Sequence, residues 1–162
     1  MVYSQIDSNK RKSFALIIVF IAIILLLGWL FGKLTNYGYN GLIIAMVISI
    51  GMSLIGYYSG DKIALVTAGA QKIEKKDNPY VYRMVENLCI TAGLPTPQVY
   101  LINDNAINAF AAGRDPKHAS IAITAGAVEK LKNEELEGVI AHELSHIKNF
   151  DIRLMTLVAI LV

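Results

Sequence analysis

Two uncharged apolar runs dominate the N-terminal third of the chain. The first covers residues 14–31 and the second residues 41–59. At 1.5 Å per residue, a helix over the first run is about 27 Å long, close to the hydrocarbon thickness of a bilayer. This run is longer than the core of a cleaved signal peptide, and no small-residue cleavage site follows it. We therefore predict two transmembrane helices that form a hairpin.

The charges that flank the two runs predict how the hairpin is oriented. Basic residues 10–12 precede the first run, Lys33 alone lies between the runs, and Lys62 follows the second. Because cytoplasmic loops carry an excess of lysine and arginine, both ends of the hairpin should be cytoplasmic. The expected parts are a cytoplasmic tail over residues 1–13, a cytoplasmic module over residues 61–151 and the start of a third, truncated membrane segment over residues 152–162.

The module begins with an ambiguous segment and then a clear helix. Residues 61–76 fit a juxtamembrane helix that leads into a short strand, but the pattern does not decide it. Asn78 can cap a helix, Pro79 suits its first position, and Gly93 can end it. Apolar residues recur at helical spacing between them, which predicts that Cys89 lies in the core rather than at a metal.

Alternating and β-branched runs follow this helix. They cover residues 98–102, 106–112 and 119–124, and they predict a small antiparallel sheet of about three strands. A short helix is expected over residues 126–131, and a longer one is expected to begin at an Asn133 cap, with acidic residues in its first turn. The predicted fold class is a membrane helical hairpin with an α+β module.

Composition narrows the classes of function. The chain is 54% hydrophobic and 17% charged with a net charge of +2, which is more apolar than a typical soluble domain. No basic run interleaved with aromatic residues is present, so nucleic acid is an unexpected partner. The single cysteine excludes an internal disulfide and a multi-cysteine zinc site within one chain.

Near the C-terminal end, two histidines stand four residues apart with a glutamate directly after the first: His142, Glu143 and His146. On a helix these histidines share one face, so both imidazoles can bind one zinc ion. Glu143 then lies beside the ion and can act as general base toward a water bound there, which gives peptide hydrolysis. The motif alone also occurs by chance on polar helices. Two of the chain's three histidines lie in it, and this favours the metal site.

Two residues just beyond the motif are candidates for orienting the ligands. Asn149 and Asp151 can hydrogen-bond a ligand imidazole from outside the metal's own ligand set. His118 has no partner in sequence, so we expect it at the surface.

The chain resembles the N-terminal part of the HtpX-type membrane metallopeptidases, which are related to the CAAX prenyl endopeptidases. The matching pieces are the hairpin, the segment Asn108-Ala109-Phe110-Ala111-Ala112-Gly113, and residues 139–151 around the motif. The resemblance implies a zincin-like module with one Zn²⁺ per complete protein. It also implies that residues 108–111 form an edge strand that binds extended substrate; a plain core strand is the alternative.

The resemblance further implies a cell-membrane enzyme of protein quality control that cleaves damaged or misassembled membrane proteins. Membrane lipid is then a partner, and a homo-oligomer or a membrane-protein partner is left open. The family's third zinc ligand is a glutamate on a later helix, which would lie beyond Val162. We therefore expect a fragment of a peptidase.

Two alternatives are weighed against the peptidase. The first is a catalytically incompetent scaffold or partner-binding fragment, favoured by the missing third ligand. The second is a deformylase-like hydrolase with a cysteine ligand, disfavoured because Cys89 lies on an apolar stripe.

Overall fold

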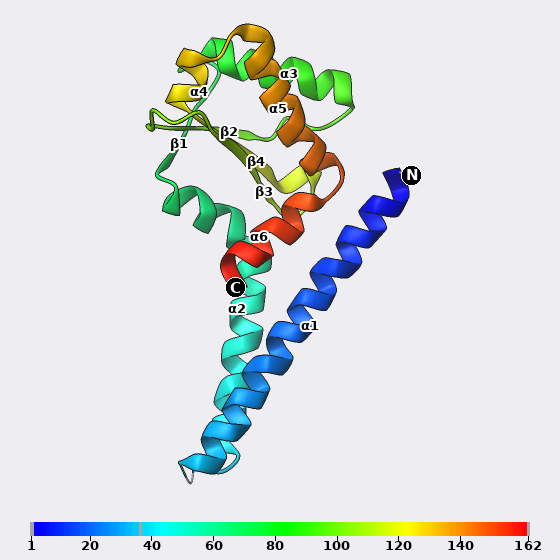
Figure 1. The fold of residues 1–162 in the computed structure, drawn as a ribbon, viewed down its shortest axis with the longest axis vertical. Helices are drawn as coiled ribbons and strands as arrows, with labels where there is room; N and C mark the ends of the chain where they lie inside the picture. Colours follow the sequence, from blue (N-terminus) through cyan, green and yellow to red (C-terminus); the bar gives the residue numbers. More distant parts are fainter. Residues whose placement is uncertain (1, 36, 162) are drawn as a thin grey trace.

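A computed structural model describes residues 2–35 and 37–161 and the side chains from Gln5 onward. Two long helices, α1 (Val2–Leu34) and α2 (Asn40–Thr67), form a hairpin, and a small α/β module sits at its open end (Figure 1). Both helices are long and apolar enough to cross a membrane. The helix α1 also includes the polar segment that we predicted as a tail. Met1 of that tail and Val162 of the predicted third segment lie outside the described residues.

Small residues bring α1 and α2 into close contact. A Cβ atom placed on Gly28 would lie 2.8 Å from the carbonyl oxygen of Gly41, and one placed on Gly32 would lie 2.2 Å from that of Gly38. Gly28 and Gly32 are four residues apart, the spacing that allows helix backbones to approach closely in membranes. Small buried residues continue along α2 at Ala45, Ser49, Ser53, Gly56 and Gly60. Ala45 faces Gly28 of α1, whereas Gly56 and Gly60 face side chains of the C-terminal segment, such as Thr156 and Leu157.

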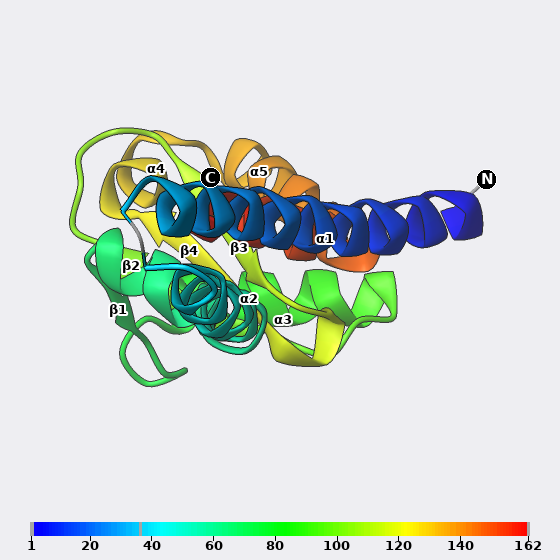
Figure 2. The same cartoon turned by 90° about the horizontal axis from the view of Figure 1, so that it is seen from below.

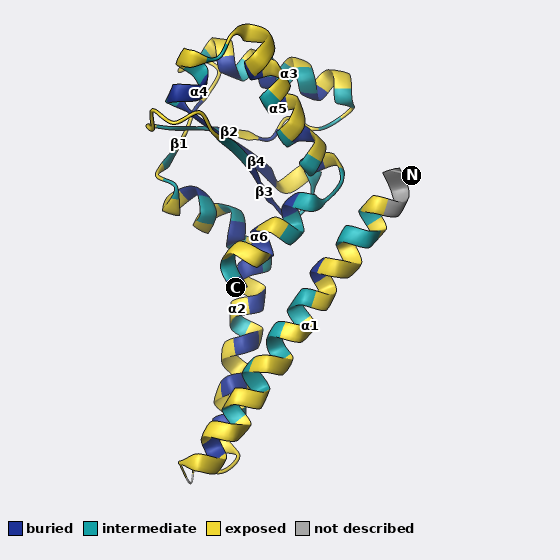
Figure 3. Cartoon of the chain, in the orientation of Figure 1, coloured by how far each residue is buried: buried dark blue, intermediate teal, exposed yellow. Residues whose placement is uncertain are grey.

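The rest of the hairpin presents apolar side chains outward. Residues such as Phe14, Leu26, Val47 and Leu54 are more than half exposed, and Figure 3 shows exposed residues along both helices. Water would not stabilise such a surface, whereas lipid tails would. The two helices therefore fit a bilayer by length, composition and surface.

The module contains a four-stranded mixed sheet. Its strands are β1 (Ala70–Lys72), β2 (Gln98–Ile102), β3 (Ala109–Gly113) and β4 (Ala119–Thr124), in the order β1-β2-β4-β3. β1 and β3 pair antiparallel with their neighbours, but β2 and β4 are parallel. The prediction of a purely antiparallel sheet of about three strands was therefore wrong. β3 passes to the outer edge, and β4 returns between β2 and β3.

The strand boundaries follow the sequence patterns with one shift. The runs at residues 98–102 and 119–124 are strands as predicted, whereas the run predicted at residues 106–112 becomes a strand only from Ala109. The residues just before Ala109 hydrogen-bond to a side chain. Thr124 Oγ1 donates to the carbonyl of Ala106 at 2.7 Å and accepts from the amide of Asn108 at 3.0 Å. The ambiguous segment contains the end of α2 and the short strand β1.

The helices of the module are α3 (Pro79–Ala92), α4 (Ala125–Lys130), α5 (Asn133–Lys148) and α6 (Asp151–Leu161), with a short 3-10 helix, η1, at Pro116–His118. The α3 cap is as predicted, since Asn78 Oδ1 accepts from the amide of Val81 at 3.1 Å. The predicted cap at Asn133 was wrong. Lys132 is the cap residue of α5, and its amide donates to Glu135 at 2.8 Å.

One apolar core joins α3, α5 and the sheet. Val81, Val85 and Cys89 of α3 meet Leu136, Ile140, Leu144 and Ile147 of α5 over Val99, Ile121 and Ile123 of the sheet. The prediction that Cys89 is a core residue is confirmed, because its side chain is fully buried there. At the junction with the hairpin, α6 packs against both α1 and α2. In the view of Figure 2, α1 lies in front of the red ribbon of α6. This core fixes α5 over the sheet.

Candidate metal centre

The helix α5 places the two motif histidines on one face. Nε2 of His142 and Nε2 of His146 are 3.2 Å apart, with the rings at 87° to each other. Two imidazole ligands of a tetrahedral zinc ion, each bound at 2.0–2.1 Å, have their nitrogens about 3.3–3.4 Å apart. The spacing of these two nitrogens therefore fits zinc. Both side chains face away from the core, because Leu144 and Ile147 take the buried positions of the same helix.

Asp151 orients one of these histidines. Its Oδ2 lies 3.0 Å from Nδ1 of His146, which leaves Nε2 directed toward His142. A carboxylate in this position holds the ring and raises the basicity of the metal-binding nitrogen. The contact depends on a sharp turn between α5 and α6, where Phe150 adopts φ 61°. Asn149, the other residue singled out from sequence, caps the end of α5, and its carbonyl accepts from Nδ2 of Asn9 at 3.1 Å.

The N-terminal end of α1 forms one wall of the site, which the sequence pattern did not suggest. Nδ2 of Asn9 also hydrogen-bonds Oδ1 of Asp151, and Lys10 lies over the ring of Phe150 at 4.6 Å. A cavity of about 380 Å³ lies between this end of α1 and the histidine helix, lined by Gln5, Ser8, Asn9, Lys12, Ser145, His146, Asn149 and Asp151. The polar segment before the first apolar run is thus part of the surroundings of the site.

Glu143 faces the edge strand β3. Its Oε2 accepts a hydrogen bond of 3.1 Å from the amide of Ala111. Within the described part of the chain, β3 pairs with β4 alone, so its other side has no neighbouring strand. Along that side the amide of Ala109 donates to Oδ1 of Asn108 at 2.9 Å, and the amide of Gly113 donates to Thr156 at 3.2 Å. Side-chain oxygens therefore occupy the positions that a paired strand would take.

The four residues predicted to bind substrate lie on or next to this edge. Asn108 is exposed and immediately precedes β3, Ala109 and Phe110 are partly buried within it, and Ala111 is buried. The structure thus brings Ala111 to Glu143, while Asn108 lies at the far end of the strand. The contact between Glu143 and Ala111 has no counterpart in sequence spacing, because 32 positions separate the two residues.

The two histidines each supply one candidate metal ligand. Within residues 2–35 and 37–161, no group of three histidine, cysteine, aspartate or glutamate side chains is placed to hold a metal ion. The donor set fits zinc in nitrogen type and spacing, but a stable zinc site requires at least one further protein ligand.

The other candidates lie elsewhere. Burial raises the pKa of the Cys89 thiol to about 11, so it is a poor ligand. His118 is half exposed, as expected, and its Nδ1 lies 2.8 Å from Oδ1 of Asp115.

Comparison with known proteins places the chain in a family. The model of peptidase family M48 matches residues 75–162, and the chain belongs to that family. It is similar to the Protease HtpX homolog of Tropheryma whipplei (strain Twist), at 44% identity over 158 residues, which covers 98% of this chain and 54% of that protein. The Protease HtpX homolog of Lactobacillus helveticus (strain DPC 4571) is 41% identical over 163 residues, which covers all of this chain and 55% of that protein.

The chain therefore spans about half the length of the curated relatives it matches. Its fold is similar to that in the crystal structure of S. mikatae Ste24p, with a TM-score of 0.52 at 17% identity, over 96% of this chain and 38% of that one. The relatives and the two apolar helices together indicate a membrane protein with a peptidase fold.

Proposed function

We propose that the complete protein is a zinc-dependent, membrane-bound endopeptidase. The observation that carries the proposal is the arrangement on α5. Two imidazole nitrogens converge at 3.2 Å, and the carboxylate between them in sequence reaches the amide of the edge strand at 3.1 Å. A metal, a base and a strand-binding edge are the three parts that hydrolysis of an extended peptide requires.

His142 and His146 would hold the ion, and a glutamate from the rest of the protein would complete the ligand set. When bound, zinc would act as a Lewis acid that polarises the scissile carbonyl and lowers the pKa of a nearby water. Asp151 keeps Nε2 of His146 free for binding by holding Nδ1 at 3.0 Å.

Glu143 would take the proton of the attacking water and pass it to the leaving amine. In the present structure its carboxylate accepts from Ala111. A substrate strand that pairs with β3 needs the same amide, so docking would release Oε2 of Glu143 for the proton transfer. Substrate pairing and base activation are coupled in this scheme.

The substrates we propose are unfolded or misassembled membrane proteins. The module lies directly at the end of the hairpin (Figure 1), and many large apolar side chains of the hairpin are exposed. The charge distribution favours a cell-membrane protein whose module lies on the cytoplasmic side, because basic residues flank the hairpin at its open end. Segments of membrane proteins that emerge on that side would meet β3.

A second function is favoured by the ligand set. The described residues bring two ligands to the site and no third, so the 162-residue chain by itself fits a catalytically incompetent scaffold that binds membrane partners. Zinc content and cleavage measured on the same purified chain separate the two proposals. Stoichiometric zinc together with cleavage would exclude the scaffold.

The peptidase proposal is tested by Glu143→Gln in the complete protein, with Glu134→Gln on the same helix as the control. Glu134 is exposed in the first turn of α5, so its change removes one charge far from the histidines. We expect loss of cleavage in the first variant only, with zinc retained in both. Cleavage that persists in Glu143→Gln would refute the assigned base.

A further inference from the structure

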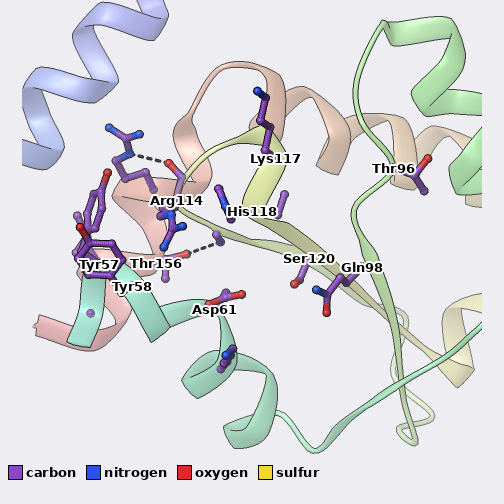
Figure 4. A pocket seen from close by; sticks show the side chains of 16 residues that line it. Tyr57, Tyr58, Asp61, Thr96, Gln98, Arg114, Lys117, His118, Ser120 and Thr156 are labelled. Carbon is purple, nitrogen blue, oxygen red and sulfur yellow. Dashed lines mark hydrogen bonds between the residues drawn. The ribbon is translucent and has the colours of Figure 1, made fainter. Parts of the chain in front are cut away.

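A separate cavity lies where the hairpin meets the module. It has a volume of about 290 Å³ and is lined by the end of α2, the β3–β4 connection, the first residues of β2 and β4, and α6 (Figure 4). None of the three motif residues lines it. Four basic side chains and one acidic side chain do: Lys62, Arg114, Lys117 and Arg153, with Asp61. The lining therefore carries a net charge of about +3, which favours an anionic ligand.

The two arginines are held in fixed positions. Nε of Arg153 donates to the carbonyl of Arg114 at 2.7 Å. The guanidinium of Arg114 lies 5.1 Å from the ring centre of Tyr58, and that of Arg153 lies 5.6 Å from that of Tyr57. Figure 4 shows the tyrosines beside the arginine side of the cavity. Stacking on aromatic rings limits the freedom of both guanidinium groups, so a ligand would order them at little entropic cost.

Asp115, a carboxylate just outside the lining, offsets only part of this charge. Asp115 is engaged by His118, at 2.8 Å, and by the amides of Lys117 and His118, at 2.9 and 3.0 Å. Partial burial alone would raise the pKa of Asp115, but the hydrogen bond and charge of His118 and the two amides lower it. Oδ2 of Asp115 also lies 3.7 Å from Nε of Arg114, an ion pair without a direct hydrogen bond, so the cavity and its surroundings keep a net charge of about +2.

Residues typical of a membrane interface lie at the cavity. Tyr57 and Tyr58 are near the end of the second uncharged run, and Asp61 and Lys62 follow within one helical turn. Tyrosine is enriched where lipid headgroups meet the hydrocarbon region. The apolar residues of α2 below them, such as Leu54 and Ile55, are more than half exposed. An occupant with a charged head at the arginines can therefore lay an apolar chain along α2.

We propose that this cavity binds the phosphodiester headgroup of an anionic phospholipid. Arg114 and Lys117 would bind the phosphate, because guanidinium and ammonium groups pair with its oxygens. Ser120 and Gln98 line the β2 and β4 side of the cavity and offer hydrogen-bonding groups to hydroxyls on the head. Phosphatidylglycerol combines both features. The bound lipid fixes the height of the module against the bilayer.

The test measures lipid retention by the detergent-purified chain with native mass spectrometry, in the presence of phosphatidylglycerol or phosphatidylcholine of the same acyl composition. The variant is Arg114→Gln with Lys117→Gln, and its matched control is Lys72→Gln with Lys76→Gln. Both control lysines are exposed at β1 and the segment after it, away from the cavity. Circular dichroism and thermal unfolding establish that each variant is folded.

We expect the chain to retain phosphatidylglycerol in preference to phosphatidylcholine. The cavity variant should bind it at least about tenfold more weakly, because losing one charge-assisted contact is worth roughly that factor. The control should bind as the unchanged chain does. Equal binding of the two lipids, or equal loss in both variants, overturns the proposal. Binding of glycerol phosphate as tight as that of the lipid assigns the site to a soluble phosphate and also overturns it.

Discussion

Oδ2 of Asp151 lies 3.0 Å from Nδ1 of His146, across the turn that joins the motif helix to α6. This contact fixes the ring so that its other nitrogen faces His142 at 3.2 Å. The residue that orients the ligand is therefore the first residue of the next helix. The left-handed backbone of Phe150 makes the close approach possible.

Replacing Asp151 with Asn should weaken zinc binding. The amide cannot supply the negative charge that makes the imidazole a stronger ligand, and loss of such an outer partner typically lowers metal affinity 10–100-fold. A competition titration against a chelator, in the complete protein, measures this change. Glu134→Gln removes the same charge from the exposed start of α5 and should leave the affinity unchanged. Identical affinities for both variants would show that the contact does not tune the site.

Gly28→Leu should separate the hairpin helices. A Cβ there would meet the Cβ of Ala45 at 2.3 Å and the carbonyl oxygen of Gly41 at 2.8 Å, and overpacking of this kind costs about 1–3 kcal/mol. Gly51→Leu is the matched control, because nothing lies within 4 Å of the added atom. Thermal unfolding in detergent, together with distances between spin labels on α1 and α2, should report a loss for Gly28→Leu alone. Equal behaviour of the two variants would contradict the packing described.

Replacement by alanine should have opposite effects on stability at Gly126 and at Gly138. At Gly126 the added Cβ would lie 2.2 Å from the carbonyl oxygen of Asn105, so the backbone must shift and the module should lose stability. Gly138 lies inside α5 with open space around it, so alanine should stabilise that helix by about 0.5–1 kcal/mol. Unfolding midpoints of the two variants check both signs.

Cys89 should be unreactive in the folded chain and should link stability to alkaline pH. Burial raises its pKa from 9.0 to about 11, so at neutral pH labelling by a thiol reagent should be roughly 100-fold slower than for a free thiol. The unfolded chain loses this proton first, so the contribution is fully present below about pH 9 and is lost as the pH rises toward about 11. The difference in stability between the unchanged chain and Cys89→Ala, measured across that range, isolates the effect. Rapid labelling without unfolding would contradict the burial.

Local sequence patterns predicted most of the helices and strands. They did not predict which strands pair with each other. The runs at residues 98–102 and 119–124 are strands because β-branched residues pack well on the pleated surface of a sheet, and the second strand is buried along its whole length. The parallel pairing of β2 and β4 was missed, since alternation does not specify strand order. The packing role of Gly28 and Gly32 was also missed, although their four-residue spacing is visible in the sequence.

The same holds for the candidate site: contacts between residues close in sequence were predictable, and contacts between distant residues were not. His142 and His146 converge because helical spacing brings them to one face, and Asp151 follows closely enough in sequence to be found. The contact of Glu143 with Ala111 and that of Asn9 with Asp151 join residues 32 and 142 positions apart. Only the folded chain shows such contacts.

Only Asn149 and Phe150 separate the helix that carries both histidines from α6, which packs against the hairpin. So short a connection limits how far the two histidines can move relative to α6 and the hairpin. In the proposed enzyme this two-residue connection would set the distance between the active site and the membrane. Peptide bonds at one short height above the membrane would be cut, and those in distant soluble domains would stay out of reach.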